Sequence, residues 1–90
     1  MDKIRILLIE DNPGDARLIE EMLKEADPAG YAVHVFTHLS QGINALLSSS
    51  FNIILLDLNL PDSQGLGTLT QLHKSAPESV IIRFLAISCG

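Results

Sequence analysis

Four stretches of the chain are almost continuously apolar, and the longer segments between them carry apolar side chains at helical spacing. Branched aliphatic side chains are frequent in these stretches, which is typical of strands covered on both faces of a sheet. The second stretch, YAVHVF, alternates in part and favours the edge of a sheet over its centre. We therefore predict four strands, over residues 4–9, 31–36, 51–56 and 80–87.

The segment after the first predicted strand has the pattern of an amphipathic helix. Asn12 is suited to its N-cap, and Pro13 and Asp15 are suited to its first turn. A cluster of Asp, Pro and Gly within residues 27–30 ends it. Its predicted inward positions are Ala16, Ile19, Met22, Leu23 and Ala26.

Two further helices are predicted from the spacing of leucines. The second runs from Leu39 to Leu47, and the serines at positions 48–50 close it. The third begins near Gly65, and Pro77 ends it because the residue before a proline avoids helical geometry. Strand and helix therefore alternate along the whole chain, without a linker or a low-complexity segment between them.

This alternation predicts an α/β domain with a parallel sheet, because each crossover helix returns the next strand to the same end of the sheet. Right-handed crossovers, with the first helix on one face and the second on the other, give the strand order 2-1-3-4 of a flavodoxin-like fold. The first and third strands are then neighbours, and the winding direction reverses between them. We expect residues 1–90 to form a single domain.

The composition narrows the classes of function. With 47% hydrophobic and 19% charged residues, the chain has the balance of a folded globular domain. Its net charge is −5 and its six basic residues are scattered, so direct binding to nucleic acid is not expected. The single cysteine, Cys89, excludes an internal disulfide, and no apolar run reaches the ~20 residues of a membrane span. We therefore expect a cytoplasmic protein without membrane contact.

Acidic residues follow the two strands that are predicted to be neighbours. Glu10 and Asp11 come directly after the first strand, and Asp57 comes directly after the third. In a parallel sheet these strand ends border the crevice where the winding direction reverses. Crowded carboxylates repel one another, a hard divalent cation such as Mg²⁺ relieves that repulsion, and an aspartate so placed can attack phosphorus to form an acyl phosphate. The alternative for each acid taken singly is a solvated loop charge.

Two motifs around these acids resemble the receiver domains of bacterial and archaeal two-component response regulators. They are LLIEDNPGDARLIEEML at the first strand and helix, and IILLDLNLPDSQGL around the third strand. The resemblance extends through residue 79. It implies that Asp57 is the phosphoacceptor and that a sensor histidine kinase or a phosphotransfer protein is the partner.

The same resemblance implies a set of ligands for Mg²⁺. Asp11 and Asp57 would bind the ion directly, and Glu10 would act through a water molecule. The residue two positions after the phosphoacceptor, Asn59, would offer its backbone carbonyl.

The C-terminal part departs from the family pattern. Receiver domains usually have five strand and helix units, whereas this chain ends with its fourth strand, which implies an incomplete receiver domain lacking the fifth strand and helix. The lysine that the family carries on the fifth strand has no counterpart. Leu85 takes the place of the family's Thr or Ser at the end of strand four, and Ser88 fills that role only in a longer strand or a shifted register. Arg83 suits an edge strand, where its charge stays solvated.

More than one function remains open. The main expectation is a phosphoacceptor module of a phosphorelay, which is not itself an enzyme. The alternative is a pseudo-receiver, an interaction module without productive phosphotransfer, because the lysine is missing. A magnesium phosphohydrolase would need a second acid where Asn59 stands. Because the missing fifth helix leaves the third and fourth strands partly bare, we also expect a homo-oligomer in which a second copy supplies the cover.

Overall fold

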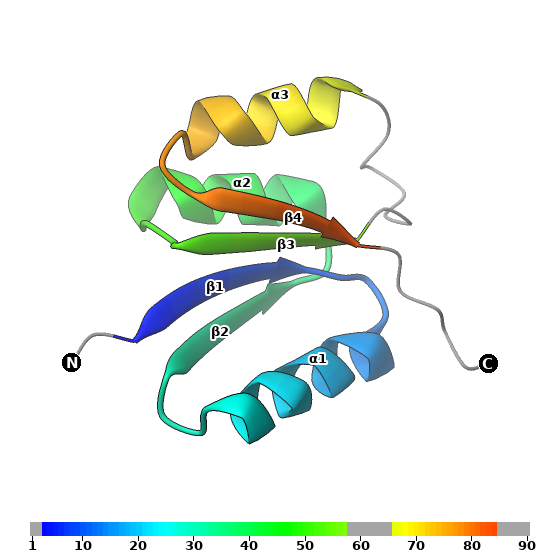
Figure 1. Cartoon of the computed structure of the whole chain (residues 1–90). Helices are drawn as coiled ribbons and strands as arrows, with labels where there is room; N and C mark the ends of the chain where they lie inside the picture. The colour runs from blue at the N-terminus through cyan, green and yellow to red at the C-terminus, as the bar shows by residue number, and fades with distance from the viewer. Residues whose placement is uncertain (1–2, 58–65, 85–90) are drawn as a thin grey trace.

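The computed structural model describes residues 3–57 and 66–84, with the backbone alone for residues 66–69. Four parallel strands in these ranges form one sheet in the order β2-β1-β3-β4 (Figure 1). They are β1 (Ile4–Ile9), β2 (Tyr31–Phe36), β3 (Ile53–Asp57) and β4 (Val80–Phe84). The predicted α/β fold with strand order 2-1-3-4 is therefore confirmed.

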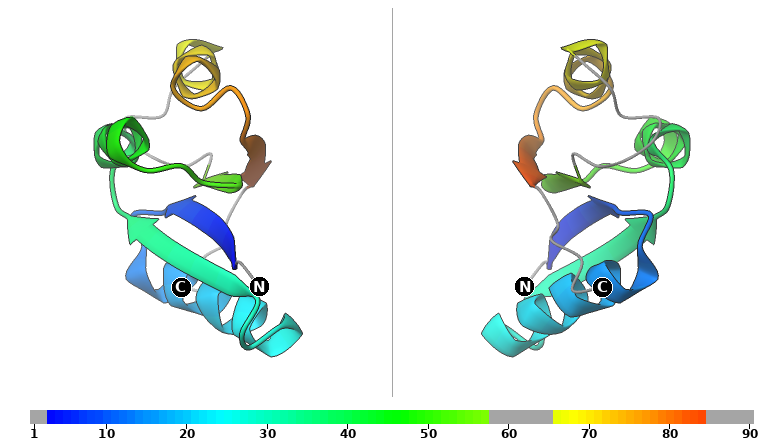
Figure 2. Two further views of the ribbon diagram at one scale, coloured as in Figure 1. Left: turned by 90° about the vertical axis from the view of Figure 1, so that its left-hand side faces the viewer. Right: turned by 90° about the vertical axis from the view of Figure 1, so that its right-hand side faces the viewer.

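Three helices connect the strands and cover both faces of the sheet. They are α1 (Pro13–Ala26), α2 (Leu39–Ser48) and α3 (Leu66–Ser75). Figure 2 shows α1 on one face and both α2 and α3 on the other. The first crossover therefore passes on the opposite face from the next two, which makes β1 and β3 neighbours at the centre of the sheet.

The main hydrophobic core lies between the sheet and the pair α2 and α3. Every second residue of the central strands points into it, as the two-residue period of a strand requires. Burying one such aliphatic side chain stabilises the fold by about 1.5–3 kcal/mol. The buried members are Leu7, Ile9, Leu39, Leu46, Phe51, Ile54, Leu56, Leu72 and Ala76.

Helix α1 begins at the predicted cap but packs through a narrower stripe than predicted. The Asn12 side chain accepts hydrogen bonds from the first turn, and α1 ends at Ala26, just before the predicted stop. Ala16 is buried, whereas Met22 is 60% exposed and Ala26 is also exposed. The prediction of an inward position was therefore wrong for Met22 and Ala26, because α1 contacts the sheet along only part of its apolar side.

The third strand is displaced along the chain from its predicted bounds. It begins at Ile53, after Asn52, whose side-chain oxygen accepts a hydrogen bond of 2.8 Å from the backbone N–H of Arg5. It extends through Asp57, which is paired in register with Phe84. Asp57 is thus the last residue of the strand and does not follow it. The later part of the fourth predicted strand, residues 85–87, lies outside the described residues.

On the face of the sheet that packs against α1, the aliphatic side chains become more exposed from the centre of the sheet toward β4. Two rows of aliphatic side chains cross β1, β3 and β4 on this face, and they are Ile6, Ile53 and Val80 in one row and Leu8, Leu55 and Ile82 in the other. The two β1 members are fully buried and the two β3 members are half-buried. The β4 members, Val80 and Ile82, are 58% and 44% exposed. Among the described residues, the side chains on this face are therefore buried on β1 but exposed on β4.

Strand β4 is an edge of the described sheet, as the position of Arg83 predicts. Arg83 lies within β4 and is exposed, so its guanidinium group remains in water. Strand β2 forms the opposite edge, also as predicted from its alternating pattern. None of the helices built from the described residues has the length and apolar character needed to cross a membrane.

Candidate functional site

The three acids identified in the sequence come together at the carboxyl ends of β1 and β3. Ile9 is paired with Leu56, so the next residues, Glu10 and Asp57, stand side by side. One carboxylate oxygen from each of Glu10, Asp11 and Asp57 lies within 4.8 Å of the others. Two distant segments of the chain therefore supply one group of acids, as the predicted topology requires.

Burial differs sharply among the three acids. Glu10 and Asp57 are 1% and 2% exposed, whereas Asp11 is exposed. Two carboxylates are therefore removed from water beside each other. Such an arrangement has a free-energy cost unless a proton or a cation compensates the charge.

The two oxygens of Glu10 have different surroundings. The backbone N–H of Asn12 donates a hydrogen bond of 3.0 Å to Oε1. Oε2 is buried and has no hydrogen-bond partner among the described residues. The backbone N–H of Glu10 donates to the carbonyl oxygen of Phe36 at 2.9 Å, which fixes the main chain at the end of β1. One carboxylate oxygen is thus held by the protein, and the other is left to a ligand or a proton.

The acidity of Glu10 reflects this environment. The pKa of Glu10 is raised from its ordinary value of 4.5 to about 7, chiefly because burial removes the carboxylate from water and also because Asp57 and Asp11 lie beside it. The hydrogen bond from Asn12 acts in the opposite direction. Without a bound cation, Glu10 is therefore partly protonated at neutral pH.

The donor set suits a hard divalent cation. Mg²⁺ prefers oxygen ligands, and with bonds of ~2.1 Å it can join oxygens up to roughly 4.2 Å apart. A group of carboxylate oxygens within 4.8 Å of one another fits an ion that some members bind directly and another through water. The unpartnered buried oxygen of Glu10 is the second observation that fits a cation at this place.

The other predicted site residues are not tested by this geometry. Asn59 and Ser88 lie outside the described residues, and so does Leu85. Within β4, the residue paired with Asp57 is Phe84.

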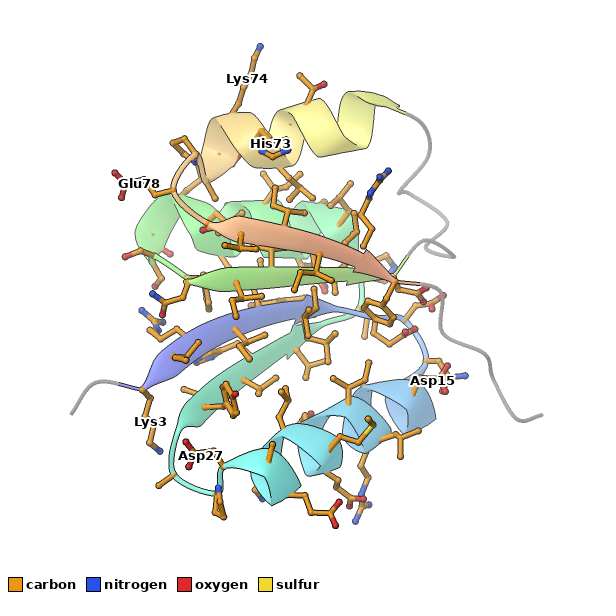
Figure 3. The ribbon with its side chains drawn as sticks, in the orientation of Figure 1. Lys3, Asp15, Asp27, His73, Lys74 and Glu78 are labelled. Atoms are coloured by element: carbon orange, nitrogen blue, oxygen red, sulfur yellow. The ribbon has the colours of Figure 1, made fainter. Side chains whose placement is uncertain are left out.

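No lysine among the described residues lies at the acid cluster, and these residues include all three lysines of the chain. Figure 3 shows Lys3 beside the start of β1 and Lys74 on the outer side of α3. Lys24 is in the last turn of α1, at the opposite end of that helix from the acids. A cationic partner for the cluster is therefore not supplied by these three side chains.

One contributor was missed by the sequence analysis. Asn12 was predicted only as a helix cap, but its backbone N–H also contacts Glu10. Its position two residues after an acid at the end of a strand was the only signal in the sequence. A contact made by the backbone N–H does not depend on the residue type, so it cannot be read from the sequence.

Comparison with protein families gives one match that spans nearly the whole chain. The family model described as "Response regulator receiver domain" matches residues 6–87. Among curated proteins, the sensor protein TorS of Escherichia coli K12 is 37% identical over 87 residues, which are 96% of this chain and 9% of TorS. The chain spans between 29% and 37% of the length of several other curated regulators.

Solved structures agree with this match. A response regulator from Burkholderia pseudomallei, described with a phosphorylated aspartic acid, a calcium ion and citrate, has a TM-score of 0.78 at 25% identity. The alignment covers 97% of this chain and 49% of that one. The complex of histidine kinase ThkA with response regulator TrrA gives a TM-score of 0.78 at 26% identity, covering 97% of this chain and 72% of that one.

Proposed function

Because the chain belongs to the response regulator receiver domain family, we propose that Asp57 accepts a phosphoryl group in a two-component phosphorelay. The observation that carries this proposal is the cluster of Glu10, Asp11 and Asp57 at the carboxyl ends of neighbouring strands. Asp57 is the member that stands at the end of β3, within the motif IILLDLNLPDSQGL, whose resemblance to the family implies that Asp57 is the phosphoacceptor.

The chemistry is a transfer between a phosphohistidine and a carboxylate. A carboxylate oxygen of Asp57 attacks phosphorus, a P–O bond forms, and the P–N bond to the donor histidine breaks, with its electron pair remaining on the imidazole. Glu10, Asp11 and Asp57 would hold Mg²⁺, with the backbone carbonyl of Asn59 as a further ligand. When bound, the ion neutralises negative charge on the phosphoryl oxygens. Burial of Asp57 limits the access of water to the acyl phosphate.

The relatives support the choice of donor and ion. The Burkholderia pseudomallei regulator is described with a phosphorylated aspartic acid and a calcium ion. TrrA is described in complex with a histidine kinase. By analogy we infer a sensor histidine kinase or a phosphotransfer protein as the donor for this chain, and Mg²⁺ as its ion.

Three further features of the proposal follow from the same reasoning. The chain is a phosphoacceptor that a kinase acts on and not an enzyme. It works in the cytoplasm, where the phosphodonor is available. It binds neither nucleic acid nor membrane directly, in keeping with its net charge of −5 and scattered basic residues.

A second candidate function is a pseudo-receiver, a module that binds partners without productive phosphotransfer. The observation that favours it is the position of Lys3, Lys24 and Lys74, none of which lies at the acid cluster. Without a lysine at the cluster, the charge of a phosphoryl group at Asp57 has less compensation from the protein. The pseudo-receiver would keep the fold and the ion site but not the acyl phosphate.

Reaction with a small phosphodonor separates the two functions. The chain is incubated with acetyl phosphate and Mg²⁺, and the intact mass is measured. We expect a gain of one phosphoryl group that Asp57→Asn abolishes. Asp27→Asn is the matched control, because Asp27 is exposed beyond the far end of α1 (Figure 3), and it should retain the gain. A wild-type chain that stays unmodified would favour the pseudo-receiver, and a gain that persists in Asp57→Asn would contradict Asp57 as the acceptor.

We also propose that the chain forms a homo-oligomer through the exposed apolar side chains of β4 on the α1 face, Val80 and Ile82. The support is the exposure of Val80 and Ile82, which continue buried rows of aliphatic side chains. A second copy that packs on these residues would remove them from water.

A further inference from the structure

Asn12 holds two parts of the protein at once. Its side-chain Oδ1 accepts hydrogen bonds from the backbone N–H groups of Gly14 and Asp15, at 2.9 and 3.2 Å. Its own backbone N–H donates to Glu10 Oε1 at 3.0 Å. The start of α1 and one oxygen of a buried carboxylate are therefore tied to the same residue.

The cap fixes the direction of the backbone N–H. Asn12 has extended backbone angles, φ −95° and ψ 113°, which place it outside the helix while its side chain binds the first turn. Because both oxygens of a carboxylate are bonded to the same planar carbon, holding Oε1 of Glu10 also restricts where Oε2 can point. Oε2 is buried in a side chain that is 1% exposed, and it has no hydrogen-bond partner among the described residues.

We propose that Asn12 is a positioning residue for the cation site. Through its cap on α1 it keeps its backbone N–H against Oε1, and this directs Oε2 of Glu10 toward the ion. Groups that orient a metal ligand in this way reduce the ordering that binding would otherwise require. This inference rests on the proposed binding of Mg²⁺ by Glu10, Asp11 and Asp57.

A purely structural role for Asn12 predicts a different effect of its substitution on the affinity for Mg²⁺. If its cap only stabilised α1, its loss would lower the free energy of unfolding, by about 0.5–2 kcal/mol, and the folded protein would bind Mg²⁺ as before. If Asn12 positions Glu10, the folded protein itself would bind the ion more weakly.

Titration calorimetry of the full chain with MgCl₂ tests this difference, at a temperature where every variant is folded. Asn12→Ala removes the cap, and we expect its dissociation constant for Mg²⁺ to rise about tenfold, at the lower end of the range for lost orienting partners. Asn12→Ser keeps a capping hydroxyl, and we expect a constant within about twofold of the wild type because Ser caps helices as well as Asn. Ala26→Gly weakens the exposed far end of α1, and its affinity should be unchanged.

The outcomes separate this inference from the function beneath it. Equal affinities in the wild type and Asn12→Ala, together with a large loss in Asp57→Asn, would overturn the role of Asn12 and leave the cation site standing. A loss in Ala26→Gly as large as in Asn12→Ala would also overturn it, because general weakening of α1 would then explain both. A wild-type chain that does not bind Mg²⁺ at millimolar concentration would overturn both proposals.

Discussion

At the scale of single residues, the unusual feature is a glutamate that the fold buries with one oxygen bound and the other unpartnered by the described residues. Glu10 is 1% exposed, next to another buried acid, Asp57. A structural residue at such a place would be expected to be apolar, because a charged group loses its hydration there. Burying Glu10 therefore lowers the stability of the ion-free protein, which is consistent with its proposed role as a ligand of Mg²⁺.

The loss of stability caused by Glu10 can be measured by comparing the free energy of unfolding of the wild type and Glu10→Gln at different pH values. The pKa of Glu10 is raised from 4.5 to about 7 in the folded protein, so folding favours the protonated form. The stabilisation is complete below pH 4.5 and is lost as the pH rises through 7. Without metal, we therefore expect Glu10→Gln to gain stability relative to the wild type between pH 5 and pH 8, as measured by urea denaturation.

Mg²⁺ should reverse the relative stability of the wild type and Glu10→Gln. A cation that binds the ionised carboxylate stabilises the folded wild type by mass action, and Gln offers a weaker ligand. At pH 8 with saturating Mg²⁺ we expect the wild type to be the more stable protein. A stability difference that is independent of both pH and Mg²⁺ would contradict the role assigned to Glu10.

At the scale of elements, the packing of α2 on β1 places the end of β1. Gly42 in α2 is buried, and a Cβ atom added there would lie 2.6 Å from Cδ1 of Ile9. Ile9 directly precedes Glu10, so α2 approaches the strand closely just before the acid cluster. A hydrogen atom in place of a side chain is what permits this approach.

Gly42→Ala should therefore destabilise the protein despite the better helix propensity of alanine. We expect a loss of about 1–3 kcal/mol in the free energy of unfolding, because the added methyl group overpacks the contact with Ile9. Asn44→Ala is the matched control on the exposed side of α2, and we expect it to change stability by less than ~0.7 kcal/mol, in the favourable direction. Urea denaturation of both variants compares them, and a Gly42→Ala protein as stable as the wild type would show that α2 can shift freely on β1.

The sequence predicted the elements well because their patterns are local. The apolar runs of β1 and β2, and the cap at Asn12, depend on neighbours in the chain, and their bounds were confirmed. The exposure of Met22 was not predictable, since it depends on how far α1 extends over the sheet. The start of β3 at Ile53 was not predicted, because the apolar run in the sequence begins earlier, at Phe51.

The acid cluster was predictable for a different reason. The strand order brings the ends of β1 and β3 together whatever the details of packing, so Glu10, Asp11 and Asp57 were placed correctly from topology alone. The hydrogen bond from Asn12 to Glu10 was not predictable, because its donor is a backbone group that every residue except proline possesses. The roles of Asn59 and Ser88 remain predictions.

At the scale of the whole molecule, the two faces of the sheet are covered unequally. Among the helices of the described residues, α2 and α3 lie on one face and α1 lies on the other (Figure 2). The residues left exposed on that face, Val80 and Ile82, lie on β4 at the edge of the described sheet. Apolar side chains next to a strand edge favour association with another chain.

Light scattering after size exclusion tests the proposed homo-oligomer. At high micromolar concentration we expect the wild type to elute with the mass of a dimer or a larger assembly, and Ile82→Glu to shift toward the monomer because a charge would be buried at the interface. Leu47→Glu is the control, since Leu47 is 76% exposed on α2, on the other face of the sheet. A monodisperse wild-type monomer would refute the proposal.

The proposed binding of Mg²⁺ would also report on the correct pairing of β1 with β3. Glu10 and Asp57 face each other only in the register that pairs Ile9 with Leu56. A slip of one residue would turn Asp57 to the opposite side of the sheet, while the helices and the strand content stayed almost the same. Molecules with the shifted register would have nearly the same circular dichroism spectrum but would not bind Mg²⁺ at this place. The fraction of molecules that bind the ion would therefore measure the fraction with the native register.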